Sequence, residues 1–304
     1  MTVLRKMGKK MKNTTFIGRK AELQSLQLLL GRRAASLVVI KGRRRIGKSR
    51  LIEEFTKKKK FLRFEGIAPT RETTAQAQRV EFARQLKNQL GIPGLEHLKD
   101  WGDLFTVLAE ATQKEEVVIL FDEITWMGSK DPVFLGKLKV VWEQFFQKNP
   151  RLILILCGSI SSWIEKNIIS STGFVGRISL KLTLEELSLN ECNSLLESRG
   201  FKGSAQEKFM ALAITGGVPW YIELINPIIP VAENIRRLCF EPDGLFVEEF
   251  KYIFSDLFGK RVPICKKIVA SLRDGAKTYE EIAKSIGYPS GGPLSEYLED
   301  LIVS

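Results

Sequence analysis

The stretch from Gly42 to Ser49 constrains the fold of this chain more than any other. It reads Gly-Arg-Arg-Arg-Ile-Gly-Lys-Ser and fits the pattern G-x-x-x-x-G-K-[ST] in full. An apolar run of strand length, 37–41, leads into it, and a helix is expected over 48–58. In such a unit the glycines let the backbone curl, so that its N–H groups point at phosphate oxygens. The sequence therefore predicts a phosphate-binding loop, with a basic glycine turn as the alternative.

The residue types in this loop have predicted roles. Lys48 is expected to reach the β and γ phosphates of a nucleotide, and the Ser49 hydroxyl to hold Mg²⁺. The partial positive charge at the start of the following helix also favours phosphate. The residues predicted to bind the nucleotide here are Gly42, Arg43, Arg44, Arg45, Ile46, Gly47, Lys48, Ser49 and Arg50.

Two acidic residues follow a second strand-like run, 116–121. Asp122 and Glu123 come about 75 residues after the phosphate loop. One carboxylate at the end of such a strand can hold Mg²⁺, and a second can activate the attacking water. We therefore expect Asp122 to be the Mg²⁺ partner and Glu123 to be the general base. A helix-start residue favoured by the helix dipole is the alternative for Glu123.

A third apolar run, 152–157, ends in Gly158 and Ser159. In a nucleotide-hydrolysing sheet, a polar side chain at this point lies between the phosphate loop and the strand that carries the acids. Ser159 is therefore predicted to bond the γ-phosphate or the water, as a sensor. A helix N-cap is the competing interpretation.

Short apolar strands alternate with amphipathic helices along the first part of the chain. This pattern predicts an α/β fold, a P-loop parallel sheet of about five strands with helices on both faces. The rest has only helical signals, including one over 185–198. We expect a basic flexible leader at 1–13, a core at 14–182, a helical lid at 183–260, and a truncated helix-turn-helix or winged-helix unit at 261–304.

The net charge of +12 is unevenly distributed. Residues 1–60 hold 19 of the 47 Lys and Arg residues and three of the 35 acids, so the remainder is mildly acidic. Much of the excess lies in or beside the phosphate loop, which favours a nucleotide over DNA as its partner. No apolar run approaches the roughly 18 residues of a membrane helix, and no signal segment is apparent, so a cytoplasmic protein is expected.

The few histidines and cysteines exclude several kinds of site. The chain has one histidine, and its four cysteines show no C-x-x-C spacing. These counts argue against a Cys/His zinc site, a disulfide framework and a histidine-based catalytic triad. Buried thiols are the expected state of the cysteines.

Several motifs in their order along the chain resemble the archaeal-type ATPase family, a branch of the STAND-like P-loop ATPases among the AAA+ relatives. The resemblance covers residue 14 to the end. It rests on 16–23 (FIGRKAEL), 42–51, 120–123 (LFDE), 157–159 (CGS), 176–177 (GR) and 215–221 (TGGVPWY).

The resemblance implies ATP as the nucleotide and adds two groups of site residues. In relatives the box that matches Phe16, Ile17, Gly18 and Arg19 lines the adenine. The proline that matches Pro219 approaches the nucleotide from the helical lid. A simple helix start with proline in its first turn is the alternative for Pro219.

The sequence departs from the family pattern in two places. Relatives tend to show Pro-Leu-Tyr-Gly-Arg where this chain has Gly173-Phe-Val-Gly-Arg177, so the arginine is kept but the residues before it differ. Arg177 is expected to act as an arginine finger or sensor, in cis or in trans. The alternative is a structural residue at a strand edge. Relatives also continue into the wing and a nuclease-like region, whereas the sequence ends at Ser304. We expect a shortened form or a fragment.

The leading hypothesis is Mg²⁺-dependent ATP binding and hydrolysis that switches the position of the lid. One alternative is a DNA- or protein-binding module that ATP regulates with little turnover. DNA is disfavoured because the last helix carries Glu296, Glu299 and Asp300, so a protein partner or self-association through the C-terminal helices is favoured. The other alternative is a truncated, inactive remnant, in which Ile264, Ile268, Ile282 and Leu298 would be poorly covered.

Overall fold

The computed structural model describes residues 16–70, 72–95, 98, 100–128, 130–258 and 261–303. The predicted basic leader lies outside these residues. Within them, no helix combines the length and the apolar character needed to cross a membrane.

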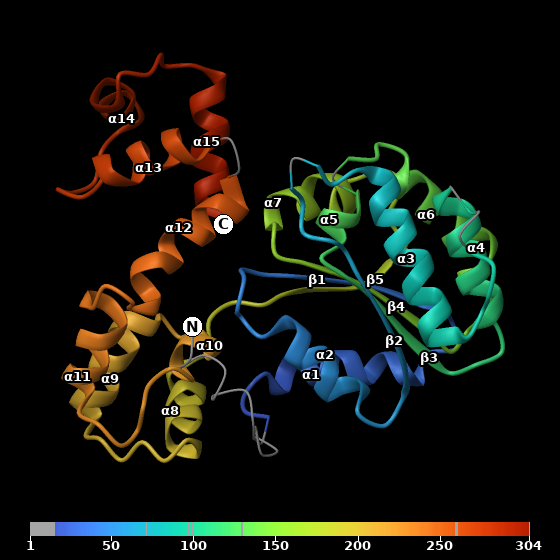
Figure 1. The fold of residues 1–304 in the computed structure, drawn as a ribbon, viewed down its shortest axis with the longest axis horizontal. Coiled ribbons are helices and arrows are strands. Elements are labelled where there is room, and N and C mark those ends of the chain that lie inside the picture. The colour runs from blue at the N-terminus through green and yellow to red at the C-terminus, as the bar shows by residue number, and fades with distance from the viewer. Residues whose placement is uncertain are drawn as a thin grey trace.

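A five-stranded parallel sheet forms the centre of the first part of the chain (Figure 1). Its strands are β1 (Ser36–Lys41), β2 (Lys60–Glu65), β3 (Val117–Asp122), β4 (Leu152–Gly158) and β5 (Ile178–Thr183). They lie in the order β2-β3-β4-β1-β5. All of the pairs are parallel, so every strand ends at the same edge of the sheet. The predicted sheet is confirmed.

Helices cover both faces of this sheet (Figure 1). Val38 and Ile40 of β1 pack on the face that buries Leu51 of the helix after the phosphate loop. Leu37 and Val39 point to the other face, which carries an aromatic core. One face is covered by α1 (Lys20–Leu28), η1 (Leu29–Gly31) and α2 (Lys48–Thr56), and the other by α3 (Ala75–Leu90), α4 (Trp101–Ala111), α5 (Ile124–Gly128), α6 (Phe134–Gln144), η2 (Phe146–Lys148), α7 (Ser161–Ile164) and η3 (Glu165–Ile169). Strands buried on two sides explain the continuous apolar runs in the sequence.

The remainder of the described chain is helical, as predicted. A first group, with its own apolar core, contains α8 (Leu189–Ser198), α9 (Ala205–Thr215), α10 (Pro219–Ile222), α11 (Val231–Ile235) and η4 (Arg236–Phe240). The helix α12 (Leu245–Phe258) leads from it to α13 (Val262–Ser271), α14 (Tyr279–Ile286) and α15 (Gly292–Val303). The predicted domain boundaries at 182/183 and 260/261 stay predictions.

The predicted start of a helix at Glu185 is wrong, because α8 begins at Leu189. Ser188 caps this helix: its Oγ accepts a hydrogen bond from the Glu191 N–H, and Glu191 Oε2 accepts one from the Ser188 N–H at 3.0 Å. This reciprocal capping box fixes the first turn. The Ser-x-x-Glu spacing at 188–191 was the sequence signal for the correct start.

The last three helices form a small core of their own. Ile268 and Leu294 are fully buried and Ile282 nearly so, while Ile264 and Leu298 are partly buried against them. The expectation of poor coverage in a truncated remnant is therefore not met at Ile268 and Ile282. Thr278 and Glu281 form a capping box at the start of α14.

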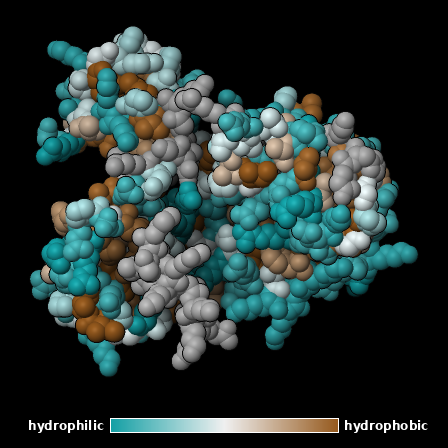
Figure 2. All heavy atoms as spheres, in the orientation of Figure 1, coloured by the Kyte–Doolittle hydropathy of each residue, from teal (hydrophilic) through white to brown (hydrophobic). Residues whose placement is uncertain are grey.

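The surface in Figure 2 is mostly hydrophilic in the view shown, with apolar side chains over the helices α9 and α11. In the segment from α9 to η4, Phe209, Ile228 and Phe240 are each more than two-thirds exposed. Isolated exposures of this kind are common in folded proteins.

Three glutamines of α3 protect the outer edge of β2. Gln89 bonds the backbone N–H and C=O of Arg63, and Gln85 bonds those of Glu65. Gln78 does the same for Ile67, at 2.9 and 2.8 Å. The three glutamine side chains thus bond the backbone groups of Arg63, Glu65 and Ile67 that a neighbouring strand would otherwise pair.

Replacing Gln78 by Ala should lower the free energy of unfolding by about 1–3 kcal/mol, because Gln78 is buried and the Ile67 backbone loses both partners. Urea denaturation measures this loss. Gln89→Ala is the matched control: Gln89 makes the same pair of bonds but is exposed, so water can replace it and the loss should stay below about 0.5 kcal/mol. Equal losses in the two variants would contradict the role of burial.

Candidate nucleotide-binding and active site

The loop between β1 and α2 has the backbone shape that its glycines predict. Gly42 has φ of 149°, and a Cβ added to it would lie 2.4 Å from the carbonyl oxygen of Leu184. Gly47 has φ of 98° and precedes the first residue of α2. Neither position accepts a side chain without strain. The loop therefore curls tightly at the carboxyl end of β1.

Lys48 lies at the centre of this loop. It is buried, and its Nζ donates hydrogen bonds to the carbonyl oxygens of Gly42 at 2.7 Å and of Arg43 at 3.0 Å. The ammonium is thus held inside the curve of the backbone, at the start of α2. A lysine and a helix N-terminus together form a favourable place for phosphate.

Two oxygen donors meet beside the loop. Ser49 Oγ lies 3.4 Å from Asp122 Oδ2, and the Asp122 carboxylate is buried. A hydroxyl and a carboxylate are hard oxygen donors, and Mg²⁺ is commonly held by one or two protein oxygens together with phosphates and water. Among the residues that the structure describes, no group of three or more acidic, His or Cys side chains is arranged so that it could hold a metal ion by itself. The donor set therefore fits Mg²⁺ bound with a nucleotide.

Glu123 and Ser159 are brought together at the ends of β3 and β4. The Ser159 hydroxyl donates to Glu123 Oε2 at 3.2 Å. Burial raises the pKa of the Glu123 carboxyl above its ordinary value, although the charge of Lys48 lowers it. Glu123 also starts the turn of α5, with the Trp126 N–H bonded to its carbonyl oxygen at 2.8 Å, which fits the helix-start alternative; its role as the general base stays a prediction.

The sheet order explains how these groups meet. Because β4 lies between β1 and β3, Ser159 stands between the phosphate loop and the two acids, as the sequence predicted. Its hydroxyl bonds the general-base candidate directly. The structure thus shows a contact between Ser159 and Glu123, and the role of Ser159 as a sensor stays a prediction.

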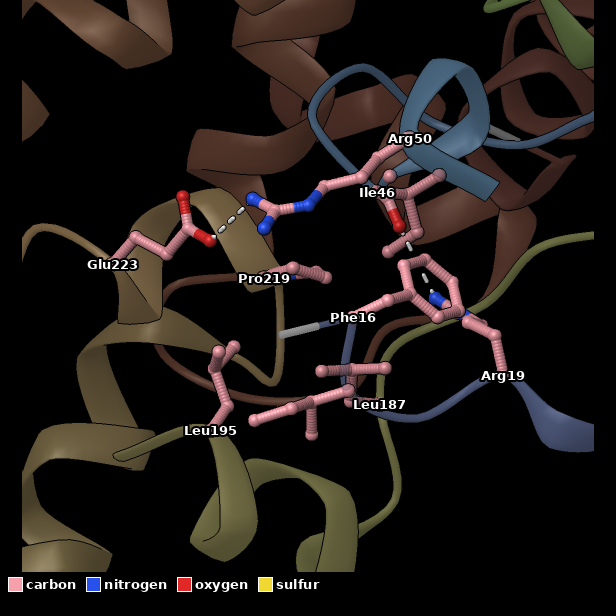
Figure 3. A pocket seen from close by; sticks show the side chains of 10 residues that line it. Phe16, Arg19, Ile46, Arg50, Leu187, Leu195, Pro219 and Glu223 are labelled. Atoms are coloured by element: carbon pink, nitrogen blue, oxygen red, sulfur yellow. Dashed lines mark hydrogen bonds and ion pairs between the residues drawn. The ribbon is translucent and has the colours of Figure 1, made fainter. Parts of the chain in front are cut away.

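A pocket beside the loop contains most of the predicted adenine box (Figure 3). Arg19 Nη2 bonds the Ile46 carbonyl oxygen at 3.2 Å, which ties the box to the loop. Gly18 does not line the pocket. The lining residues are Phe16, Ile17, Arg19, Ile46, Gly47, Arg50, Leu187, Leu195, Pro219 and Glu223.

Pro219 lies where the helical segment, defined as residues 184–258 after β5, meets the phosphate loop. Its Cγ lies 3.8 Å from the point where a Cβ of Gly47 would stand. It is also the first residue of α10, so the alternative of a helix start is met, and its approach to a nucleotide stays a prediction.

Arginines near the phosphate loop pair with acids of the helical segment. Arg43 lies 2.9 Å from Glu186, and Arg50 lies 3.0 Å from Glu223. Arg45 pairs with the buried Glu249. These contacts connect the loop to the end of β5, to α10 and to α12.

Arg45 makes the most buried of these contacts. Its guanidinium lies 3.7 Å from the centre of the Trp220 ring, and the Tyr221 hydroxyl donates to the other oxygen of Glu249 at 2.9 Å. A stacked cation that also neutralises a buried carboxylate is a strong local interaction.

Arg177 does not belong to this site within the same chain. It precedes β5, at the amino end of that strand, whereas the site lies at the carboxyl ends. Its Nε donates to Glu143 of α6 at 2.7 Å. The predicted contact with the nucleotide in cis is therefore not met, and the alternative of a structural residue at the strand edge fits its position.

Several residues of the site carry no motif and were not predicted. Arg63 of β2 bonds Asp122, while Leu187, Leu195 and Glu223 line the pocket. Arg63 lies within an ordinary strand pattern and reaches Asp122 only through the pairing of β2 with β3. No sequence signal for these contacts existed before the fold was known.

Two proteins of Methanocaldococcus jannaschii are similar to this chain in sequence. The chain is 22% identical over 288 residues to an uncharacterized protein of Methanocaldococcus jannaschii, a match that covers 94% of this chain and 60% of that protein. A shorter match, 42% identical over 48 residues, is to an uncharacterized ATP-binding protein of the same organism and covers 16% of this chain and 81% of that protein. The chain thus spans about 60% of the length of the longer relative.

Solved structures show the same fold. A Walker-type ATPase of Pyrococcus abyssi superposes with a TM-score of 0.68 at 17% identity, over 97% of this chain and 91% of that one. The ORC2 protein of Aeropyrum pernix, in ADPNP–ADP complexes, gives a TM-score of 0.58 at 15% identity, over 94% and 85% of the two chains. At these identities the likeness concerns the fold alone.

The family assignment rests on a longer match of the sequence itself. A family model described as an ATPase domain predominantly from Archaea matches residues 16–225, from the adenine box through Pro219 to the end of the α10 region. The resemblance inferred from the motifs is thereby confirmed, and the chain belongs to this family of P-loop ATPase domains.

Proposed function

We propose that this protein binds ATP with Mg²⁺, hydrolyses it, and uses the cycle to move the helical segment relative to the sheet. The observation that carries the proposal is the gathering of Lys48, Ser49, Asp122 and Glu123 at one edge of the sheet. Together they supply a phosphate-binding cation, a pair of magnesium ligands and a base.

The residues of the chain divide the work of hydrolysis. The loop N–H groups and Lys48 bind the phosphates, and Ser49 and Asp122 hold Mg²⁺. When bound, Mg²⁺ neutralises the charge on the β and γ phosphates. The Glu123 carboxylate accepts a proton from the attacking water, and Ser159 orients that carboxylate through Oε2.

The arginine–acid pairs support the proposed movement. Arg43, Arg45 and Arg50 lie in or beside the phosphate loop, yet their charges are balanced by acids of the helical segment. Phosphate groups that enter the loop compete with those acids for the same guanidinium groups. Nucleotide binding would then weaken some of the contacts that hold the segment in place.

The size of the pocket supports the same movement. Its interior is about 40 Å³, whereas typical ligand pockets reach roughly 300 Å³ or more. Since Leu187, Leu195, Pro219 and Glu223 of the helical side line it, the pocket widens if that side moves away from the phosphate loop.

Two substitutions separate binding from turnover. Lys48→Ala removes the charge-assisted bonds to phosphate and should weaken ATP binding by about 10- to 100-fold. Glu123→Gln keeps the phosphate contacts but cannot accept the proton, so ATP should still bind while turnover falls by about 100-fold or more. Equilibrium binding of a fluorescent ATP analogue and release of phosphate measure the two quantities.

The control for Glu123→Gln is Glu116→Gln, which makes the same chemical change on the exposed residue just before β3. It should leave both binding and turnover as in the unsubstituted protein. Turnover that survives Glu123→Gln would contradict the role of Glu123 as the base. Undiminished ATP binding by Lys48→Ala would contradict the phosphate site itself.

A third substitution tests the link between the loop and the helical segment. Glu249→Gln leaves Arg45 without its counter-charge, so we expect the free energy of unfolding to fall by about 2 kcal/mol. Breaking a fully buried ion pair costs roughly 3–5 kcal/mol. The expected loss is smaller here because Arg45 is a quarter exposed. ATP should then raise the melting temperature more than it does in the unsubstituted protein, since phosphate offsets the charge of Arg45.

Thermal melting with and without ATP measures both effects of this substitution. Glu186→Gln, which breaks the exposed pair with Arg43, is the control and should cost less than about 1 kcal/mol. An equal ATP-induced rise in the melting temperature of Glu249→Gln and the unsubstituted protein would argue against competition between phosphate and Glu249.

A further inference from the structure

The carboxylate assigned to magnesium already has a cationic partner. Arg63 Nη2 donates to Asp122 Oδ2 at 2.7 Å. This is the same oxygen that lies 3.4 Å from the Ser49 hydroxyl. The other oxygen, Oδ1, accepts the Glu123 N–H at 3.1 Å. The Arg63 guanidinium therefore contacts Asp122 Oδ2, the carboxylate oxygen that faces Ser49. Ser49 is the other predicted magnesium ligand.

Burial explains why Asp122 needs this partner. The side chain of Asp122 is only 5% exposed, and an uncompensated carboxylate at that depth is strongly unfavourable. Among the residues that the structure describes, Arg63 is the only cation recorded in an ion pair with Asp122. Arg63 thus neutralises the carboxylate in the protein without nucleotide.

Two further carboxylates flank the same guanidinium. Glu65 Oε2 lies 3.6 Å from Arg63 Nη2, and Glu53 Oε1 lies 3.8 Å from Arg63 Nη1. Both are more than half exposed, whereas the Arg63 side chain is about one-third exposed. A small rotation of the arginine away from Asp122 therefore keeps it paired with carboxylates.

A magnesium ion held by Ser49 and Asp122 would lie close to the Arg63 guanidinium, because all three groups meet at Asp122 Oδ2. It would share an oxygen that already accepts a hydrogen bond from that guanidinium. Two positive charges also repel each other at this distance. The ion and the arginine are thus competitors for one carboxylate oxygen.

We propose that Arg63 takes the place of magnesium at Asp122 in the nucleotide-free protein and moves toward Glu53 and Glu65 when magnesium arrives with the nucleotide. This inference rests on the proposed function, because it requires magnesium at Ser49 and Asp122. In this proposal Arg63 is a positioning residue, and it sets the Mg²⁺ concentration at which the nucleotide binds.

The test is a magnesium titration of nucleotide binding. A fluorescent, non-hydrolysable ATP analogue is bound to the full chain at increasing Mg²⁺ concentrations, in the unsubstituted protein and in Arg63→Gln. With its competitor removed, Arg63→Gln should reach half-maximal binding at about tenfold lower Mg²⁺. Binding in EDTA should be the same in both proteins, because Arg63 contacts the carboxylate and not the phosphates in this proposal.

Thermal melting gives a second readout that does not depend on turnover. Arg63→Gln should melt at a lower temperature without ligand, since Asp122 loses its counter-charge, and Mg²⁺ with the nucleotide analogue should restore most of the loss. Arg63→Lys keeps a positive charge and should need an Mg²⁺ concentration closer to that of the unsubstituted protein. Arg84→Gln, an exposed arginine of α3 that pairs with Glu81, is the matched control and should change neither readout.

The outcomes distinguish this inference from the proposed function. If the unsubstituted protein binds the analogue in a magnesium-dependent way and Arg63→Gln needs the same or more Mg²⁺, the placeholder role of Arg63 is overturned while the ATP site stands. Weaker binding of Arg63→Gln in EDTA would assign Arg63 to the phosphates and also overturn it. If the unsubstituted protein binds no analogue at any Mg²⁺ concentration, both proposals fail together.

Discussion

The position of β4 between β1 and β3 is the constraint on which the candidate site depends. In a parallel sheet all carboxyl ends face one edge, so the loops after these three strands meet there. The loop after β1 supplies Lys48 and Ser49, β3 supplies Asp122 and Glu123, and the end of β4 supplies Ser159. A different order of the same strands would separate Glu123 from its hydrogen-bond partner Ser159.

The backbone of the site is held in conformations that are unfavourable by themselves. Among the described residues, the non-glycine residues with positive φ are Arg19, Arg45 and Glu123. Each costs about 1–2 kcal/mol relative to a right-handed conformation. All three belong to the predicted site, and each has further contacts that offset this cost: Arg19 with Ile46, Arg45 with Glu249, and Glu123 with Ser159. Strain concentrated in this way is typical of functional sites.

The sequence predicted those parts of the site that depend on local geometry. The phosphate loop needs glycine at fixed positions and a strand and helix beside it, and all of these are visible in consecutive residues. Asp122 and Glu123 were found because they follow a buried strand. Pro219 came only from the family resemblance, since a proline at a helix start has a sufficient local explanation.

Contacts between distant elements could not be predicted in the same way. Arg63 reaches Asp122 through the register of two strands, and Glu249 reaches Arg45 from a helix two hundred residues later in the chain. The position of Arg177 follows from the topology of the sheet. Arg177 precedes its strand, and a residue at the amino end of a parallel strand lies at the edge opposite the site, so the direction of the strand alone was enough to place it elsewhere.

The uneven charge of the chain follows from these contacts. The basic excess of the first sixty residues includes Arg43, Arg45 and Arg50, and the acids that balance them come from the later, mildly acidic part. The two parts are therefore electrostatically complementary where they meet. Arg63 and Asp122 repeat this arrangement within the sheet. If the proposed function holds, a protein charge in both places stands where the nucleotide or its magnesium ion would bring a charge, and ligand binding would require the protein's own ion pairs to rearrange.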